Sequence, residues 1–76
     1  MSIYQLNIAG KDFYIKSQES DIKNLLKHVS ESFLGTEYFA IKYNEDSNPV
    51  FFKKDKLISI QKVDNVSQSM RIWLLV

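Results

Sequence analysis

Hydrophobic and polar residues alternate along several short stretches of the chain. Between residues 3 and 8, Tyr4, Leu6 and Ile8 fall on one side of an extended chain, and a period of two is typical of a strand. Further short runs, rich in aromatic and β-branched residues, recur to the end of the sequence and are bounded by Gly, Pro, Asn and Asp. The predicted strands cover residues 3–8, 13–16, 38–43, 50–53, 57–63 and 70–76.

In one stretch the apolar residues recur with a different period. Between the second and third predicted strands, apolar residues recur at steps of three and four, which predicts an amphipathic helix over about residues 19–34. Ser17 or Ser20 can cap its N-terminus, and Gly35 can end it. The face predicted to be buried carries Ile22, Leu25, Leu26, Val29 and Phe33.

The element order is therefore β-β-α-β-β-β-β, in a single domain over residues 1–76. It predicts an α+β fold with one amphipathic helix packed on a mostly antiparallel sheet. In one topology, residues 38–63 form a meander beside the first hairpin. In the other, the last strand lies beside the first, and the order then resembles that of ubiquitin-like β-grasp domains. No C-terminal Gly-Gly is present, so the resemblance does not imply conjugation chemistry.

Composition narrows the class of protein. A chain of 76 residues has room for one core, and it has no cysteine, which excludes disulfides and thiolate sites for metals or redox chemistry. A small domain without disulfides favours a reducing compartment. The N-terminus has no signal-peptide pattern, and no apolar run approaches the ~20 residues that span a bilayer. We therefore expect a cytoplasmic protein without membrane association.

Catalytic and metal-binding motifs are not evident. His28 is the single histidine, and it has no second histidine at helical spacing with which to hold a metal. Nucleophile and phosphate-binding motifs need glycines that this chain lacks, and the pair Glu45 and Asp46 is typical of a turn. We therefore expect no enzymatic activity, no metal and no cofactor.

The sheet face opposite the helix is the best candidate for a function, because one helix cannot cover both faces of six strands. Strand parity assigns Ile58, Ile60, Ile72 and Leu74 to the helix side. It assigns the following residues to the open face: Ile3, Tyr14, Lys16, Tyr38, Lys42, Phe51, Lys53, Leu57, Val63, Arg71, Trp73 and Leu75.

Aromatic residues and arginine are enriched at the cores of protein interfaces. The predicted partner-binding residues are accordingly Tyr14, Tyr38, Phe51, Lys53, Arg71 and Trp73, with Trp73 as the anchor.

Two functions fit such a face. The first is a small interaction protein that binds a protein partner or itself. Nine lysines to one arginine indicate an AT-rich coding sequence, and small proteins of this kind are often accessory proteins of phages or mobile elements. The alternative is a nucleic-acid-binding module that stacks bases on the same aromatics. Its basic residues would be Lys16, Lys42, Lys53, Lys54 and Arg71. The wider basic cluster of Lys53, Lys54, Lys56 and Lys62 is either a solvated turn that guards a strand edge or a contact for an anion or nucleic acid. A net charge of +1 argues against strong bulk attraction to phosphates.

Overall fold

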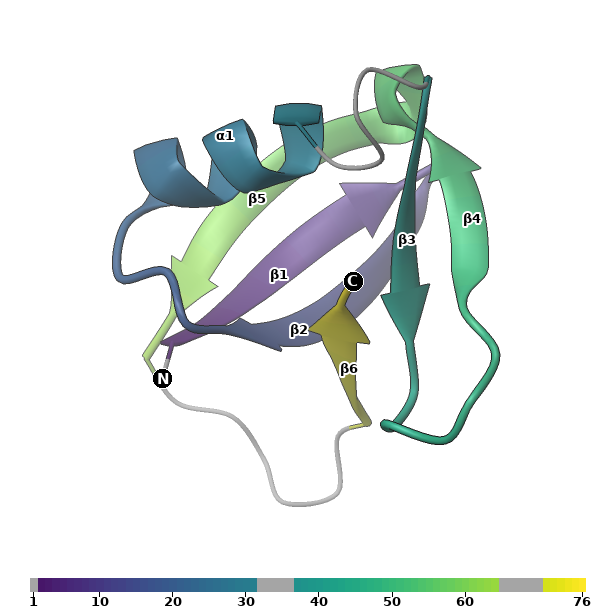
Figure 1. Cartoon of the computed structure of the whole chain (residues 1–76). Coiled ribbons are helices and arrows are strands. Elements are labelled where there is room, and N and C mark those ends of the chain that lie inside the picture. The colour runs from purple at the N-terminus through teal and green to yellow at the C-terminus, as the bar shows by residue number, and fades with distance from the viewer. Residues whose placement is uncertain (1, 32–36, 65–70) are drawn as a thin grey trace.

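The computed structural model describes residues 2–31, 37–64 and 71–76, which form one helix packed on a six-stranded sheet (Figure 1). Both the element order and the mostly antiparallel character of the sheet agree with the sequence prediction, so the α+β class is confirmed. The elements are β1 (Ser2–Ile8), β2 (Lys11–Ser17), α1 (Ile22–Glu31), β3 (Tyr38–Lys42), β4 (Val50–Lys53), the 3-10 turn η2 (Lys54–Lys56), β5 (Leu57–Val63) and β6 (Ile72–Leu75).

The strands lie in the order β4-β3-β6-β2-β1-β5. β6 runs parallel to β2 and antiparallel to β3 in the middle of the sheet, while β5 pairs with β1 at the far edge. Neither predicted topology has this strand order. β6 lies beside β2 rather than beside β1, and β5 pairs with β1 instead of continuing the sheet beside β4. Local periodicity identifies a strand without specifying which strand it pairs with, so the sequence could not decide this point.

A two-residue turn fixes the register of the first hairpin. Ala9 and Gly10 connect the paired residues Ile8 and Lys11, and both have positive φ angles, 54° and 91°. Two positive φ angles in succession define a type I′ turn, whose twist matches that of the flanking strands. The Asn7 Oδ1 accepts the Gly10 N–H at 3.1 Å and holds the turn closed.

Asp21 caps the helix. Its Oδ1 accepts the Asn24 N–H at 2.9 Å, which satisfies one of the backbone donors left open at a helix start. The predicted caps were wrong: the Ser17 hydroxyl instead accepts the Glu19 N–H at 3.1 Å, and Ser20 precedes the cap. The helix therefore begins at Ile22 rather than near residue 19. Its predicted end, including Phe33 and Gly35, lies outside the described residues.

The helix buries a narrower face than the sequence predicted. Leu25 and Val29 are buried and Ile22 packs against them, as expected. Leu26, however, is 46% exposed, so its predicted place in the core is wrong. Successive helical residues are turned by about 100°, which puts Leu26 on the flank of the helix when Leu25 points straight at the sheet.

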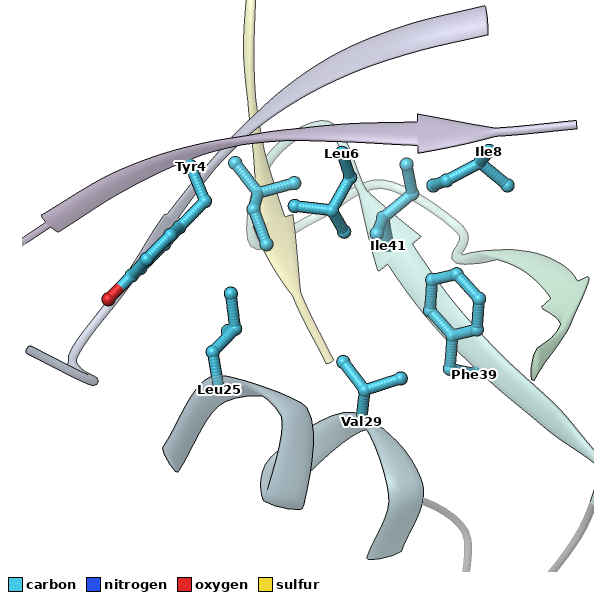
Figure 2. Packing of buried hydrophobic residues seen from close by; sticks show 8 residues of the cluster. Tyr4, Leu6, Ile8, Leu25, Val29, Phe39 and Ile41 are labelled. Carbon is cyan, nitrogen blue, oxygen red and sulfur yellow. The ribbon is translucent and has the colours of Figure 1, made fainter. Parts of the chain in front are cut away.

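The core lies between α1 and the sheet (Figure 2). Tyr4 is completely buried, and its hydroxyl donates to the Glu19 carbonyl at 2.8 Å, which ties β1 to the segment that leads into the helix. Because a buried hydroxyl without a partner is destabilising, this bond lets a tyrosine occupy the core. The buried cluster comprises Tyr4, Leu6, Ile8, Ile15, Leu25, Val29, Phe39 and Ile41.

β6 presents the opposite face from the one predicted. Trp73 is the register partner of Ile15, Leu75 is the partner of Ile41, and both partners are fully buried on the helix side. Trp73 and Leu75 therefore pack against the core, while Ile72 and Leu74 point away from it. The prediction failed because an uninterrupted apolar strand has no alternation that could specify its inward face.

The start of β5 also differs from the prediction. The register with β1 shifts so that Asn7 pairs with Ser59 and Ile8 with Leu57, leaving Ile58 without a partner in the register. Leu57 consequently packs against the core, and Ile58 is 67% exposed. A β-bulge of this kind inserts one residue and disturbs the alternation of faces, which strict parity cannot anticipate.

Candidate interaction surface

The sheet is strongly curled, with the helix on its inner side. The rings of Phe13 on β2 and Phe52 on β4 lie 5.6 Å apart, although β6 and β3 separate these two strands. In a flat sheet the same strands would lie about 14 Å apart. Both rings are on the helix side, because Phe13 is paired with Leu6 and Phe52 with Phe39. The face without the helix is therefore the outer, convex side.

A cluster of aromatic side chains lies on the inner side of the sheet. Trp73 makes edge contacts with Phe13 and with Tyr43, each at a centroid distance of 5.7 Å. The Arg71 guanidinium lies 4.6 Å from the centre of the Tyr43 ring, in a cation–π arrangement. Trp73 and Arg71, which were predicted to lie on the open face, are thus on the same side as the core.

We call the outer surface the helix-free face. Four of the six predicted partner-binding residues lie on it: Tyr14, Tyr38, Phe51 and Lys53. From β6, this face carries Ile72 and Leu74 in place of the predicted Trp73 and Leu75. Because β6 is apolar throughout, its sequence could not identify Ile72 and Leu74 as the outward residues. The helix-free face comprises Ile3, Tyr14, Lys16, Tyr38, Lys42, Phe51, Lys53, Val63, Ile72 and Leu74.

Two large aromatic side chains are exposed at one side of this face. Tyr38 on β3 is 42% exposed and Phe51 on β4 is 52% exposed. They are diagonal neighbours, because Tyr38 is paired with Lys53 and Phe51 with Ala40. Diagonal neighbours on one sheet face are within reach of each other, so the two rings and the lysine form one local surface.

Lysines flank an apolar side chain in the centre of the helix-free face. Lys16 on β2 and Lys42 on β3 are both register partners of Leu74, on either side of β6. Lys42 forms a salt bridge to Glu45 with an N–O distance of 3.3 Å. Surface ion pairs of this kind contribute little to stability, so Lys42 can exchange its carboxylate for that of another molecule.

An open groove of about 690 Å³ follows β6. Its lining includes Ile72, Leu74, Lys16 and Lys42 from the helix-free face. It also includes Tyr43, Leu75 and His28 from the helix side, so the groove runs from one face to the other. Its lining combines apolar and charged side chains, as in surfaces that bind polypeptide segments. The groove is shallow rather than enclosed, which distinguishes it from the concave sites that bury most of a small ligand.

The predicted basic cluster does not form a single patch. The Lys54 ammonium donates to the Ser30 carbonyl at 2.7 Å, and the Lys62 ammonium donates to the Ser20 carbonyl at 2.9 Å. Both lysines therefore hold the segments at the two ends of the helix. Lys53 alone of this cluster contributes to the helix-free face.

Within residues 2–31, 37–64 and 71–76, no three His, Cys, Asp or Glu side chains come together in a way that could hold a metal ion. In the same ranges, no helix has the length and apolar character needed to cross a bilayer.

Comparisons with protein-family models, with curated proteins and with solved structures find no match.

Proposed function

We propose that this is a small non-enzymatic interaction protein that binds another protein through its helix-free face. The observation that carries the proposal is the exposure of Tyr38 and Phe51 side by side on a sheet face that α1 does not cover. Aromatic side chains provide a large contact area at a low cost in conformational entropy, which is why they anchor protein interfaces.

The rest of the face supports a protein partner. Ile72 and Leu74 add apolar surface in the middle of the same face, and Lys16 and Lys42 add charged groups on either side of Leu74. An apolar centre with charged residues around it is the usual composition of a protein interface. Because the chain contains no cysteine, the proposed location is the cytoplasm, and its small size and lysine-rich composition support a role as an accessory protein of a phage or mobile element.

Site-specific photocrosslinking tests the proposal. Benzoylphenylalanine replaces Phe51 in one variant and Lys27, on the exposed side of α1, in the matched control. Both variants are irradiated in a reducing extract of the cells that carry the gene. We expect a discrete protein adduct at position 51 that Tyr38→Ser suppresses, and none at position 27. Equal labelling at both positions, or no adduct at position 51, would contradict the proposal.

Nucleic-acid binding is the second candidate, since Lys16, Lys42 and Lys53 lie on the same face as the exposed aromatics. Phosphate contacts make affinity fall steeply with salt, whereas an apolar protein interface responds weakly. With a net charge of +1, we expect feeble binding of single-stranded oligonucleotides at physiological salt. Micromolar binding whose salt dependence corresponds to several phosphate contacts, together with nuclease-sensitive adducts at position 51, would favour this second function.

A further inference from the structure

A second surface lies at the edge of the sheet formed by β5. β5 is the longer of the two edge strands, with seven residues against four in β4. It is paired with β1 on one side, and every second residue directs its N–H and C=O toward the other side. An edge of this length is a template for pairing with another strand.

Exposed apolar side chains accompany this edge. Ile58, the extra residue of the bulge, is 67% exposed and is the most exposed large hydrophobic residue that the structure describes. Leu26, at 46% exposure, lies on the flank of α1 about 200° around the helix from His28. Because His28 lines the groove along β6, Leu26 faces away from that groove. The helix itself lies over β5 (Figure 1).

The sequence of β5 is compatible with itself in the antiparallel direction. When two copies are aligned about Ile60, the middle residue, the five residues from Ile58 to Lys62 overlap. Ile58 then faces Lys62 of the other copy and Ser59 faces Gln61, while Leu57 lies beyond the bulge on the core side and takes no part in the pairing. Lys62 is the one charged residue of the strand, and it lies opposite Ile58 rather than opposite Lys62 of the other copy. This register therefore brings no like charges together.

We propose that the occupant of this edge is a second copy of the chain, paired through β5 in that register. A two-fold axis perpendicular to the sheet relates the copies, as in other isologous dimers. The two sheets join into one, both helices lie on the same side of it, and the contact covers Ile58 and Leu26. The helix-free faces of the two copies then form one continuous surface. This inference is independent of the partner proposed for that face.

Disulfide trapping tests the register directly, because the chain has no cysteine of its own. Ser59 and Gln61 are both exposed, and the register places each opposite the other across the axis at a separation suited to a disulfide. We expect an equimolar mixture of Ser59→Cys and Gln61→Cys proteins to form a linked dimer about tenfold faster than either protein alone. A mixture that oxidises no faster than the separate proteins would overturn the register.

Sedimentation equilibrium tests the dimer itself. We expect the wild type to dimerise with a dissociation constant below about 1 mM. Ile58→Glu or Leu26→Glu should raise this constant by about tenfold or more. Both side chains are exposed in the single chain, so these variants should keep its circular dichroism spectrum. Val50→Glu, at the other edge and 43% exposed, is the matched control and should dimerise normally. The proposal would be overturned by a wild type that stays monomeric, or by a dimer whose dissociation constant does not change in Ile58→Glu.

Discussion

Replacing Trp73 with alanine provides the sharpest test of which way β6 faces. Trp73 is partly buried, packs against the core, and makes edge contacts with the rings of Phe13 and Tyr43. Deleting a fully buried tryptophan or phenylalanine side chain costs about 3–5 kcal/mol, and each aromatic pair contributes about 0.5–1.5 kcal/mol beyond its buried area. Since Trp73 is partly exposed, we expect the Trp73→Ala protein to lose about 2–4 kcal/mol of unfolding free energy.

That loss is large for a chain of this size. Stabilities of about 0.05–0.15 kcal/mol per residue correspond to about 4–11 kcal/mol for the whole domain. Urea unfolding, followed by tyrosine fluorescence and circular dichroism, should therefore show a midpoint lower by roughly 1–4 M at an m-value of about 1–2 kcal/mol/M. An m-value equal to that of the wild type would show that the variant still unfolds in a single cooperative step.

Phe51→Ala is the matched control, because it removes an aromatic ring of similar kind from the helix-free face. Phe51 is 52% exposed, so its loss should cost about 1 kcal/mol or less. If Phe51→Ala destabilised the protein more than Trp73→Ala, Trp73 would lie on the open face and the assignment of faces along β6 would be refuted.

Four further substitutions, in three tests, probe other parts of the structure by the same denaturation assay. Val29→Asp should leave the chain unfolded while Leu26→Asp changes its stability by less than about 1 kcal/mol, and equal effects would show that the buried face of α1 is assigned wrongly. Tyr4→Phe should cost about 1 kcal/mol by leaving the Glu19 carbonyl without its donor, and a neutral result would show that this bond does not form. Ala9→Asn should stabilise the hairpin by about 0.5 kcal/mol, because asparagine tolerates the positive φ better than alanine; destabilisation would contradict the type I′ turn.

The sequence was most informative where polar and apolar residues alternate clearly. β1 has such a pattern, and Tyr4, Leu6 and Ile8 are all buried as predicted. The apolar spacing of the helix likewise identified Leu25 and Val29. In these segments each local pattern determines which side faces the core, so one sequence suffices to predict it.

The errors occurred where local pattern carries too little information. The run from Ile72 to Leu75 is apolar at every position, so both of its faces can be buried, and its inward face depends on pairing with β2 and β3. At Ile58 a bulge breaks the alternation that parity assumes. Trp73, Leu75 and Leu57 were assigned to the open face because they lie in or next to these two segments.

The capping residue illustrates a third kind of limit. Ser17, Ser20 and Asp21 are all good helix caps by residue type, and sequence alone cannot choose among neighbours. Ser17 is held in a turn by its bond to the Glu19 N–H, which leaves Asp21 as the residue that can reach the first turn of the helix. Helix boundaries depend on such competition between adjacent polar side chains.

The central position of β6 determines how this chain can reach its native state. β1 and β2, and likewise β3 and β4, are neighbours along the chain and can pair soon after the chain begins to fold. These two hairpins join into one sheet only when β6 inserts between them, which pairs Trp73 with Ile15 from the other end of the sequence. Pairing across such a separation is entropically costly and slows folding to about the millisecond-to-second range. We therefore expect the insertion of β6 between the two hairpins to limit the rate of folding.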